Sequence, residues 1–352
     1  MASEDRVTEL AGEVEPADAS AAEAARERQS GLLKPQGSLG RLEELGARLA
    51  GMAGAPPPVP ENPAVVVCAG DHGVLAQGVS PWPEEVTAAM VENFCTGGAA
   101  VNAIARTVGT RVSVLDVGVA SELVQHPLLR RAKVRPGTDD LSEGPAMSRE
   151  EAARAIVAGA GIAEELVESG GVDLLVTGDM GIGNTTPAAC LTAALSGRPA
   201  TEVTGRGTGI DDATLGRKIG VVERALDLHR PDPGDALGTL AALGGLEHAA
   251  LVGLILTGAV YRIPVLLDGV VSNSAALVAR ALAPASIDYT VAGHLSAEPG
   301  ARVALETLGL EPLLELGMRL GEGTGGSLAV PLVQAAARTL CEMATLDEAG
   351  IA

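Results

Sequence analysis

The sequence predicts an α/β protein with a parallel sheet covered by helices on both faces, as in Rossmann-like folds. Each strand-like run leads into a glycine-containing loop and then a helical pattern, an alternation typical of parallel sheets. The runs are apolar on both faces, as strands buried within a sheet are. They are AVVVC at 64–68, RVSVLDV at 111–117, VDLLVT at 172–177, IPVLLD at 263–268 and IDYTVA at 287–292.

The composition predicts a large core of aliphatic side chains. Apolar residues make up 47% of the 352 residues, but aromatic residues only 1%. The 45 glycines allow backbone segments to approach one another closely. The cysteines form no C-x-x-C pair, so we expect reduced core residues of a cytoplasmic protein. They are Cys68, Cys95, Cys190 and Cys341.

The net charge of −20 argues against nucleic acid or an anionic membrane as a partner, since both require basic patches. A small anionic substrate stays compatible with this charge because backbone N–H groups can bind it. The longest apolar run, at 249–260, is shorter than the roughly 20 residues that a membrane span needs. The acidic start of the chain does not resemble a secretory signal.

The amino-terminal part of the chain is expected to precede the sheet. Residues 1–17 are acidic and rich in alanine, and their composition predicts a disordered leader. Helices are predicted at 18–30 and 38–53, and the proline-rich stretch at 56–63 marks a boundary. Within the α/β part, Ser148 and Glu151 predict a capping box at the start of a long helix.

Ligands of open α/β sheets bind outside the carboxyl ends of the strands. The loops expected at that edge span 69–74, 116–119, 177–187, 268–274 and 293–298. They carry Asp71, His72, Asp116, Asp179, Asp268 and His294. Each of these side chains taken singly could be an ordinary loop or capping residue, but the set favours a binding site.

The loop TGDMGIGNTTP at 177–187 combines glycines with Thr186 as an expected N-cap and Pro187 at the first helical position. A helix amino terminus there would suit a phosphate, although plain turn chemistry explains the pattern equally well. Lys218, one of three lysines, lies on a helix after another glycine loop. It is either a solvated side chain or a cation beside an anionic ligand.

Two further features allow two interpretations each. Trp82 lies between two prolines, and with Met90 it could wall a flat apolar ligand or simply anchor packing. Glu322 lies in RLGEGTGG, where it could be a base of raised pKa or part of an exposed capping turn. The five histidines have no ligand spacing such as H-E-x-x-H, so the sequence predicts neither a metal site nor a cofactor.

The chain resembles the nicotinate-nucleotide–dimethylbenzimidazole phosphoribosyltransferases of cobalamin biosynthesis from about residue 32 onward. The resemblance is carried by long motifs in family order. They include KPQGSLGRLE, GVSPWPEEVT, GDMGIGNTTPAA, GRGTGIDD, GHLSAEPG, PLLELGMRLGEGTGG and EMATLDEAG. It implies transfer of phosphoribose from nicotinate mononucleotide to a benzimidazole, by a single inverting displacement.

The resemblance also implies roles for individual residues. Glu322 would be the general base, Asp179 a second carboxylate at the site and Lys218 a nearby cation. Trp82, Met90 and Leu320 would line the acceptor pocket. The nucleotide would be held by three loops whose site residues are Gly178, Met180, Gly181, Asn184, Thr185, Gly205, Gly207, His294 and Ser296. Gly321 and Gly323 would flank the base.

The family's architecture implies a homodimer whose subunits each combine two domains. Residues 18–60 together with 325–352 would form a small helical domain, and 61–324 the α/β catalytic domain. Asp179 is one methylene shorter than the glutamate found at this position in some members. A different aromatic acceptor, such as a phenol or purine, and a non-catalytic nucleotide-binding protein stay open as alternatives.

Overall fold

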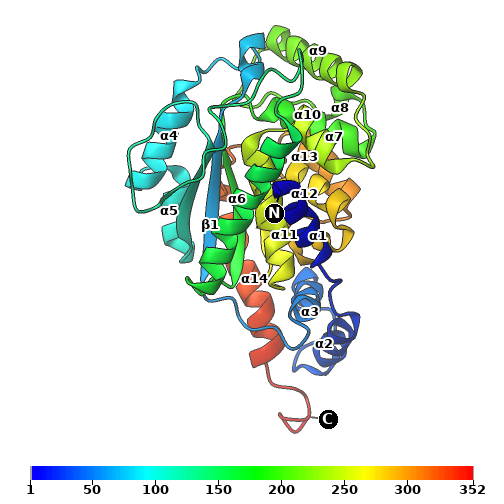
Figure 1. Cartoon of the computed structure of the whole chain (residues 1–352). Helices are drawn as coiled ribbons and strands as arrows, with labels where there is room; N and C mark the ends of the chain where they lie inside the picture. Colours follow the sequence, from blue (N-terminus) through cyan, green and yellow to red (C-terminus); the bar gives the residue numbers. More distant parts are fainter. Residues whose placement is uncertain (1, 352) are drawn as a thin grey trace.

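The computed structural model describes residues 2–351 and confirms the parallel α/β fold, with helices on both faces of one six-stranded sheet (Figure 1). The strands run in the order β3-β2-β1-β4-β5-β6, and each adjacent pair is parallel. Their bounds are β1 Pro63–Gly70, β2 Arg111–Gly118, β3 Leu129–Arg131, β4 Leu174–Met180, β5 Val265–Leu267 and β6 Thr290–Ala292. The strand order changes direction between β1 and β4, and such switch points open a crevice at the carboxyl ends.

Side chains of β1 alternate between two cores, as the pleat of a strand requires. Val66 and Cys68 belong to the core under α6 (Arg149–Glu168) and α11 (Leu246–Val260). Val65 and Val67 belong to the core under α4 (Glu85–Thr96), α5 (Ala100–Val108) and α14 (Thr324–Glu342). The helices are α1 Ser3–Gly12, α2 Ala19–Gly31, α3 Arg41–Ala53, α4 Glu85–Thr96, α5 Ala100–Val108, α6 Arg149–Glu168, α7 Thr185–Ser196, α8 Ala200–Val203, α9 Asp212–His229, α10 Ala236–Leu243, α11 Leu246–Val260, α12 Val270–Leu282, α13 Pro299–Leu308 and α14 Thr324–Glu342. Short 3₁₀ helices lie at η1 Gly73–Gln77 and η2 Pro284–Tyr289.

The sequence located the strands of the sheet with two differences. The run at 287–292 begins as the 3₁₀ helix η2, and only its last three residues form β6. The edge strand β3 was not predicted, because its three residues are half-buried or exposed and carry two arginines. The capping box is confirmed, since the Ser148 side chain accepts from the Glu151 N–H and Glu151 accepts from the Ser148 N–H.

The prediction of a disordered leader over residues 1–17 was wrong. Most of this segment is the helix α1, which packs on α6 (Figure 1). Val7 and Leu10, three residues apart on one face, are buried in the main core. Arg6 pairs with Glu164 of α6 at 3.1 Å. The acidic residues of α1 lie mainly on its exposed face. Its apolar face packs against α6 and α11, which themselves cover the sheet.

Helices α2 and α3 pack against the carboxyl-terminal part of α14, away from the amino terminus itself (Figure 1). Ala25 of α2, Ala47 and Ala50 of α3 and Leu340 of α14 form a small cluster of their own. α14 also contacts β4 and β5 through its earlier turns, so it links this cluster to the sheet. The division into two domains at these boundaries stays a prediction.

The sequence also predicted reduced cysteines and the lack of a membrane span. All four cysteines are free, and three of them are buried in the core. Within residues 2–351, every helix is too short or too polar to cross a lipid bilayer.

Candidate active site

A cavity lies at the carboxyl end of β4, beside the switch point between β1 and β4. It encloses about 630 Å³ of empty space, part of it continuous with solvent. Nine predicted site residues line it: Asp179, Gly181, Asn184, Thr185, Gly207, Lys218, Ser296, Leu320 and Gly321. The loop after β4 and the start of α7 form one wall, and the loop before α14 forms another. The predicted edge of the sheet therefore does carry a cavity.

The loop around Glu322 has an unusual backbone. Gly321, Glu322 and Gly323 have φ values of 81°, 64° and 85°, so three consecutive residues are left-handed. This conformation is easy for glycine and strained for other residues. A Cβ at position 323 would also collide with Val65, and one at Gly178 would lie 2.7 Å from the Glu322 carbonyl oxygen. The glycines thus allow the loop to lie directly on the sheet.

The Glu322 carboxylate is buried, and its Oε2 accepts a hydrogen bond from the Val101 N–H at 3.4 Å. Burial raises the pKa of Glu322 to about 7, and the negative charge of Asp268 adds to this rise against the Val101 hydrogen bond. A carboxylate with this pKa can accept and release a proton at neutral pH. The interpretation of Glu322 as part of an exposed capping turn is therefore wrong.

Asp179 lies at the end of β4, next to the same loop. It accepts a hydrogen bond from Asn184 Nδ2 at 2.9 Å through one oxygen, and its other oxygen has no hydrogen-bond partner among residues 2–351. Burial raises the pKa of Asp179 well above its ordinary value, and the charge of Asp268 adds to the rise. A Cβ at Gly321 would lie 3.1 Å from Asp179 Oδ2. Asp179 and the Glu322 loop are thus in close contact.

Lys218 of α9 points inward and is only 1% exposed, so its interpretation as a solvated side chain was wrong. Its Nζ donates to Thr185 Oγ1 at 2.7 Å and to the Gly205 carbonyl oxygen at 3.1 Å. Burial lowers the pKa of Lys218 to about 8, although the charge of Glu298 opposes this. A cation thus lies beside the first turn of α7, where the helix dipole also favours an anion.

That first turn differs slightly from its prediction. α7 begins at Thr185 with Asn184 at the N-cap, so Thr186 is a buried residue of the first turn and not the N-cap. Pro187 follows as the third helical residue, where its missing N–H is still harmless.

Only one of the three residues expected to line the acceptor pocket lines the cavity. Trp82 and Leu320 are 52% and 55% exposed, and of the two only Leu320 lines the cavity. Met90 is half-buried and packs against the core beneath α4. Met180 packs against this core as well.

His294 lies beneath the Glu322 loop rather than in the cavity. It is buried, with its Nε2 3.5 Å from Asp268 Oδ1. Gly325 at the start of α14 touches its ring so closely that a Cβ there would collide with it. His294 therefore supports the loop that carries Glu322.

Comparison with known proteins agrees with this geometry. A family model described as "Phosphoribosyltransferase" matches residues 14–351. A nicotinate-nucleotide–dimethylbenzimidazole phosphoribosyltransferase from Salinispora tropica is 56% identical over 352 residues, covering 96% of each chain. One from Chloroflexus aggregans is 55% identical over 345 residues, covering 98% of each. A crystal structure of such an enzyme from Thermus thermophilus has a TM-score of 0.90 and 49% identity, covering 95% of this chain and 99% of that one.

The chain belongs to the nicotinate-nucleotide–dimethylbenzimidazole phosphoribosyltransferase family. It is thus a phosphoribosyltransferase, as its motifs predicted.

Three charged residues of this phosphoribosyltransferase were not singled out from the sequence. Arg206, Glu298 and Arg319 line the cavity. Glu298 Oε1 accepts from the Gly207 N–H at 2.8 Å, and Arg319 Nη1 donates to the Gly207 carbonyl oxygen at 2.6 Å. Both side chains therefore shape the glycine loop beside Lys218. Each of the three is a charged residue within a glycine-containing motif, and that position was the only signal in the sequence.

Proposed function

We propose that this phosphoribosyltransferase transfers the phosphoribosyl group of nicotinate mononucleotide to 5,6-dimethylbenzimidazole, giving α-ribazole 5′-phosphate and nicotinate. The observation that carries the proposal is the Glu322 carboxylate, buried on a left-handed glycine loop with a pKa of about 7. Relatives about 55% identical over nearly the whole chain carry the name of an enzyme with this donor and acceptor, which supports the proposal.

The donor phosphate would bind where positive groups meet. Lys218, Arg206 and Arg319 reach the cavity from separate segments, and the first turn of α7 faces the same space. Guanidinium and ammonium groups together with a helix amino terminus suit a phosphate well. The remaining loop residues, including Gly181, Gly205 and Ser296, would position the ribose and the nicotinate ring.

The buried carboxylates suit the charge of the reacting sugar. The ring nitrogen of bound nicotinate mononucleotide is cationic, and the ribose gains oxocarbenium character as the bond to that nitrogen breaks. Asp268 places negative charge at the end of β5, near the Glu322 loop, and Asp179 at the end of β4 adds a carboxyl oxygen that has no hydrogen-bond partner among residues 2–351. Fixed charges aimed at a developing cation stabilise the transition state without reorganisation.

The proposed reaction consists of one displacement at the anomeric carbon and one proton transfer to Glu322. A benzimidazole nitrogen forms a bond to the anomeric carbon as the bond from that carbon to the nicotinate nitrogen breaks, with inversion at carbon. The electron pair of the broken bond returns to nicotinate. Glu322 removes the N–H proton from the other acceptor nitrogen, so the product ring does not stay positive. A general base of this kind contributes roughly 10²–10⁴-fold in rate.

The acceptor would lie between the Glu322 loop and the exposed side chains of Trp82 and Leu320. Both side chains present apolar surface to solvent in the single chain, and an apolar acceptor or a second subunit would cover it. We further propose that the enzyme is a cytoplasmic homodimer. Its partners would be small-molecule substrates, and neither nucleic acid nor a membrane.

Incubation of the purified enzyme with nicotinate mononucleotide and dimethylbenzimidazole tests the proposal. We expect nicotinate release, with a product of the mass of ribazole phosphate and an anomeric proton signal of the α configuration. Adenine and phenol run in parallel would separate a different acceptor from the proposed one. A β-configured product would disprove the inverting displacement, and absence of nicotinate release with every acceptor would disprove the activity.

A further inference from the structure

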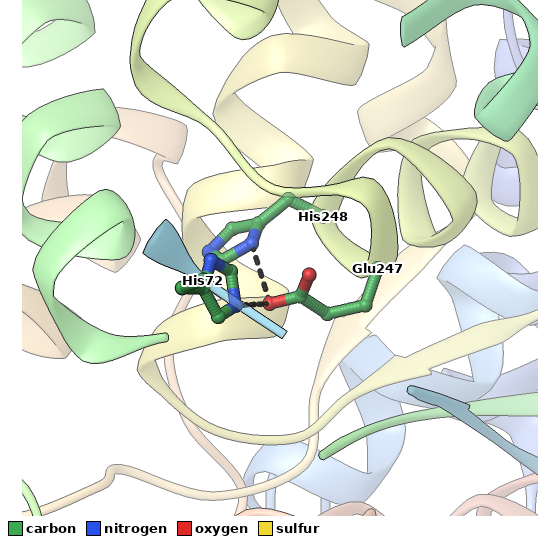
Figure 2. Close-up of side chains that lie close together, drawn as sticks. All are labelled: His72, Glu247 and His248. Carbon is green, nitrogen blue, oxygen red and sulfur yellow. Dashed lines mark hydrogen bonds and ion pairs between the residues drawn. The ribbon is translucent and has the colours of Figure 1, made fainter. Parts of the chain in front are cut away.

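Three buried side chains with metal-binding atoms lie close together (Figure 2), next to Gly181 of the cavity lining. His72 follows β1, and Glu247 and His248 are in the first turn of α11. One ligand atom from each lies within 4.8 Å of the others. His72 Nε2 is 2.7 Å and His248 Nδ1 2.9 Å from the same oxygen, Glu247 Oε1. The side chains of His72 and Glu247, like that of His248, are completely buried.

Hydrogen bonds within the chain do not satisfy this cluster. His248 Nδ1 lies close to Glu247 Oε1 without the orientation of a hydrogen bond. Among the described residues, both nitrogens of His248, Nδ1 of His72 and Oε2 of Glu247 have no hydrogen-bond partner. Leaving a buried polar atom unpaired is unfavourable, because the atom has lost its hydrogen bonds to water without replacing them. Two of these atoms, His248 Nδ1 and Glu247 Oε2, lie on either side of the same space beside Gly245, which indicates a further bound group there.

Glycine keeps the centre of the cluster free of side chains. A Cβ at Gly245 would lie 2.6 Å from Glu247 Oε2 and 2.9 Å from His248 Nδ1, and it would collide with the His72 ring. A Cβ at Gly181 would lie 3.0 Å from His72 Nε2. One at Gly70 would lie 3.1 Å from Glu247 Oε2. Three separate segments therefore lack side chains where the imidazoles and the carboxylate converge.

We propose that His72, Glu247 and His248 bind one divalent transition-metal ion, with Zn²⁺ the best match to their chemistry. Two imidazoles and a carboxylate are a common donor set for zinc, which binds nitrogen and oxygen at about 2.0–2.2 Å. The ligand atoms would separate by roughly half an ångström to admit the ion. The unpaired Glu247 Oε2 gives the carboxylate a second coordinating oxygen, and water can complete the coordination.

The ion would have a structural role in this enzyme. It would join the turn after β1 to the start of α11, directly beneath Gly181 in the loop that lines the cavity. The sequence predicted no metal site because 175 residues separate His72 from Glu247, so no ligand spacing is visible. Only the fold brings the two segments together.

The test uses untagged enzyme, stripped with a chelator, reloaded with Zn²⁺ and desalted. Metal content by mass spectrometry should show about one ion per chain. Co²⁺ loading should produce visible d–d absorption, and added Zn²⁺ should raise the midpoint of thermal unfolding of the stripped enzyme. His248→Ala and Glu247→Gln should lose the bound ion. His126→Ala, which removes a half-buried imidazole outside the cluster, should keep it.

Each outcome decides for or against the ion. If wild type carries no more metal than His248→Ala, and Zn²⁺ leaves its unfolding midpoint unchanged, the cluster holds protons only and the proposal is wrong. The wild-type measurements stand by themselves if a variant fails to fold. None of these readouts requires catalytic activity, so the proposed function and the metal site can fail independently.

Discussion

The Asp268 carboxylate accepts hydrogen bonds from the backbone N–H groups of Gly323 at 3.2 Å and Gly326 at 2.9 Å. Asp268 directly follows β5, whereas the two glycines flank the start of α14. One side chain thereby ties the end of a central strand to the loop that carries Glu322. The same carboxylate satisfies N–H groups that have no partner within α14, and its negative charge interacts favourably with the positive end of the helix dipole.

Asp268→Asn should misplace the proposed base and change its titration. The amide keeps one acceptor but loses the charge and one hydrogen bond, so we expect kcat to fall roughly 10- to 100-fold. Because the charge of Asp268 contributes to the raised pKa of Glu322, the acid limb of the pH–rate profile should move to lower pH. An acid limb at its wild-type position, measured over pH 5 to 9, would show that Asp268 has only a structural role.

Glu322→Gln should remove the proposed general base while keeping the shape of the side chain. We expect kcat to fall by about 10²–10⁴-fold with nearly unchanged donor binding, measured by steady-state kinetics and calorimetry. Glu315→Gln, the same change at an exposed position just before the loop, should keep wild-type rates. Full activity in Glu322→Gln would assign the proton to another group.

The same substitution should stabilise the enzyme at high pH. The pKa of Glu322 is raised from 4.5 to about 7, so its contribution to wild-type stability is complete below pH 4.5 and is lost as pH rises through 7. Glutamine does not titrate, and Glu322→Gln should therefore gain on the order of 2–3 kcal/mol relative to wild type between pH 5 and pH 8. Denaturant unfolding at both pH values measures the difference, and an equal effect at both would contradict the raised pKa.

The ionisation of Lys218 should limit donor use at alkaline pH. With a pKa of about 8, its ammonium is present below pH 8 and lost above it. The base Glu322 is active above pH 7, so kcat/KM for the donor should peak between 7 and 8. Lys218→Arg should extend the alkaline limb, because arginine stays charged.

Lys218→Met provides the complementary measurement. It should raise KM for the donor about tenfold or more, through loss of a charge-assisted contact with the phosphate. Arg217→Met, the neighbouring cation on the exposed side of α9, should leave KM unchanged. If both variants kept the wild-type KM, the phosphate would bind elsewhere.

The amino-terminal helix should contribute to global stability. Leu10→Ala removes a side chain that is 1% exposed, and such changes cost about 2–5 kcal/mol. Leu228→Ala makes the same change where the side chain is 51% exposed and should cost far less. Urea unfolding compares the two, and equal midpoints would mean that α1 is detached in solution.

The features readable from the sequence were those with a local signal. The strand at 64–68 is recognisable because five apolar residues precede a glycine turn, and the Glu322 loop because glycine surrounds one acid. β3 carries no such signal, since a short edge strand needs no apolar run. In α1 a narrow apolar stripe was hidden by an acidic composition.

Relationships across long sequence distances were not predictable in this way. The Asp268 carboxylate reaches Gly323, 55 residues later, only because β5 ends beside the start of α14. Likewise, Lys218 gave an ambiguous signal on its helix until packing turned it toward Thr185. In both cases the tertiary arrangement determines the role, and the local pattern permits several.

α14 is a 19-residue rod, roughly 28 Å long, whose two ends serve different purposes. One end abuts the proposed base, while the other packs on α2 and α3. A change that shifts the carboxyl end of α14 along the helix axis would therefore displace the loop that carries Glu322. Engineering of this enzyme should place added segments at its amino terminus, away from that rod.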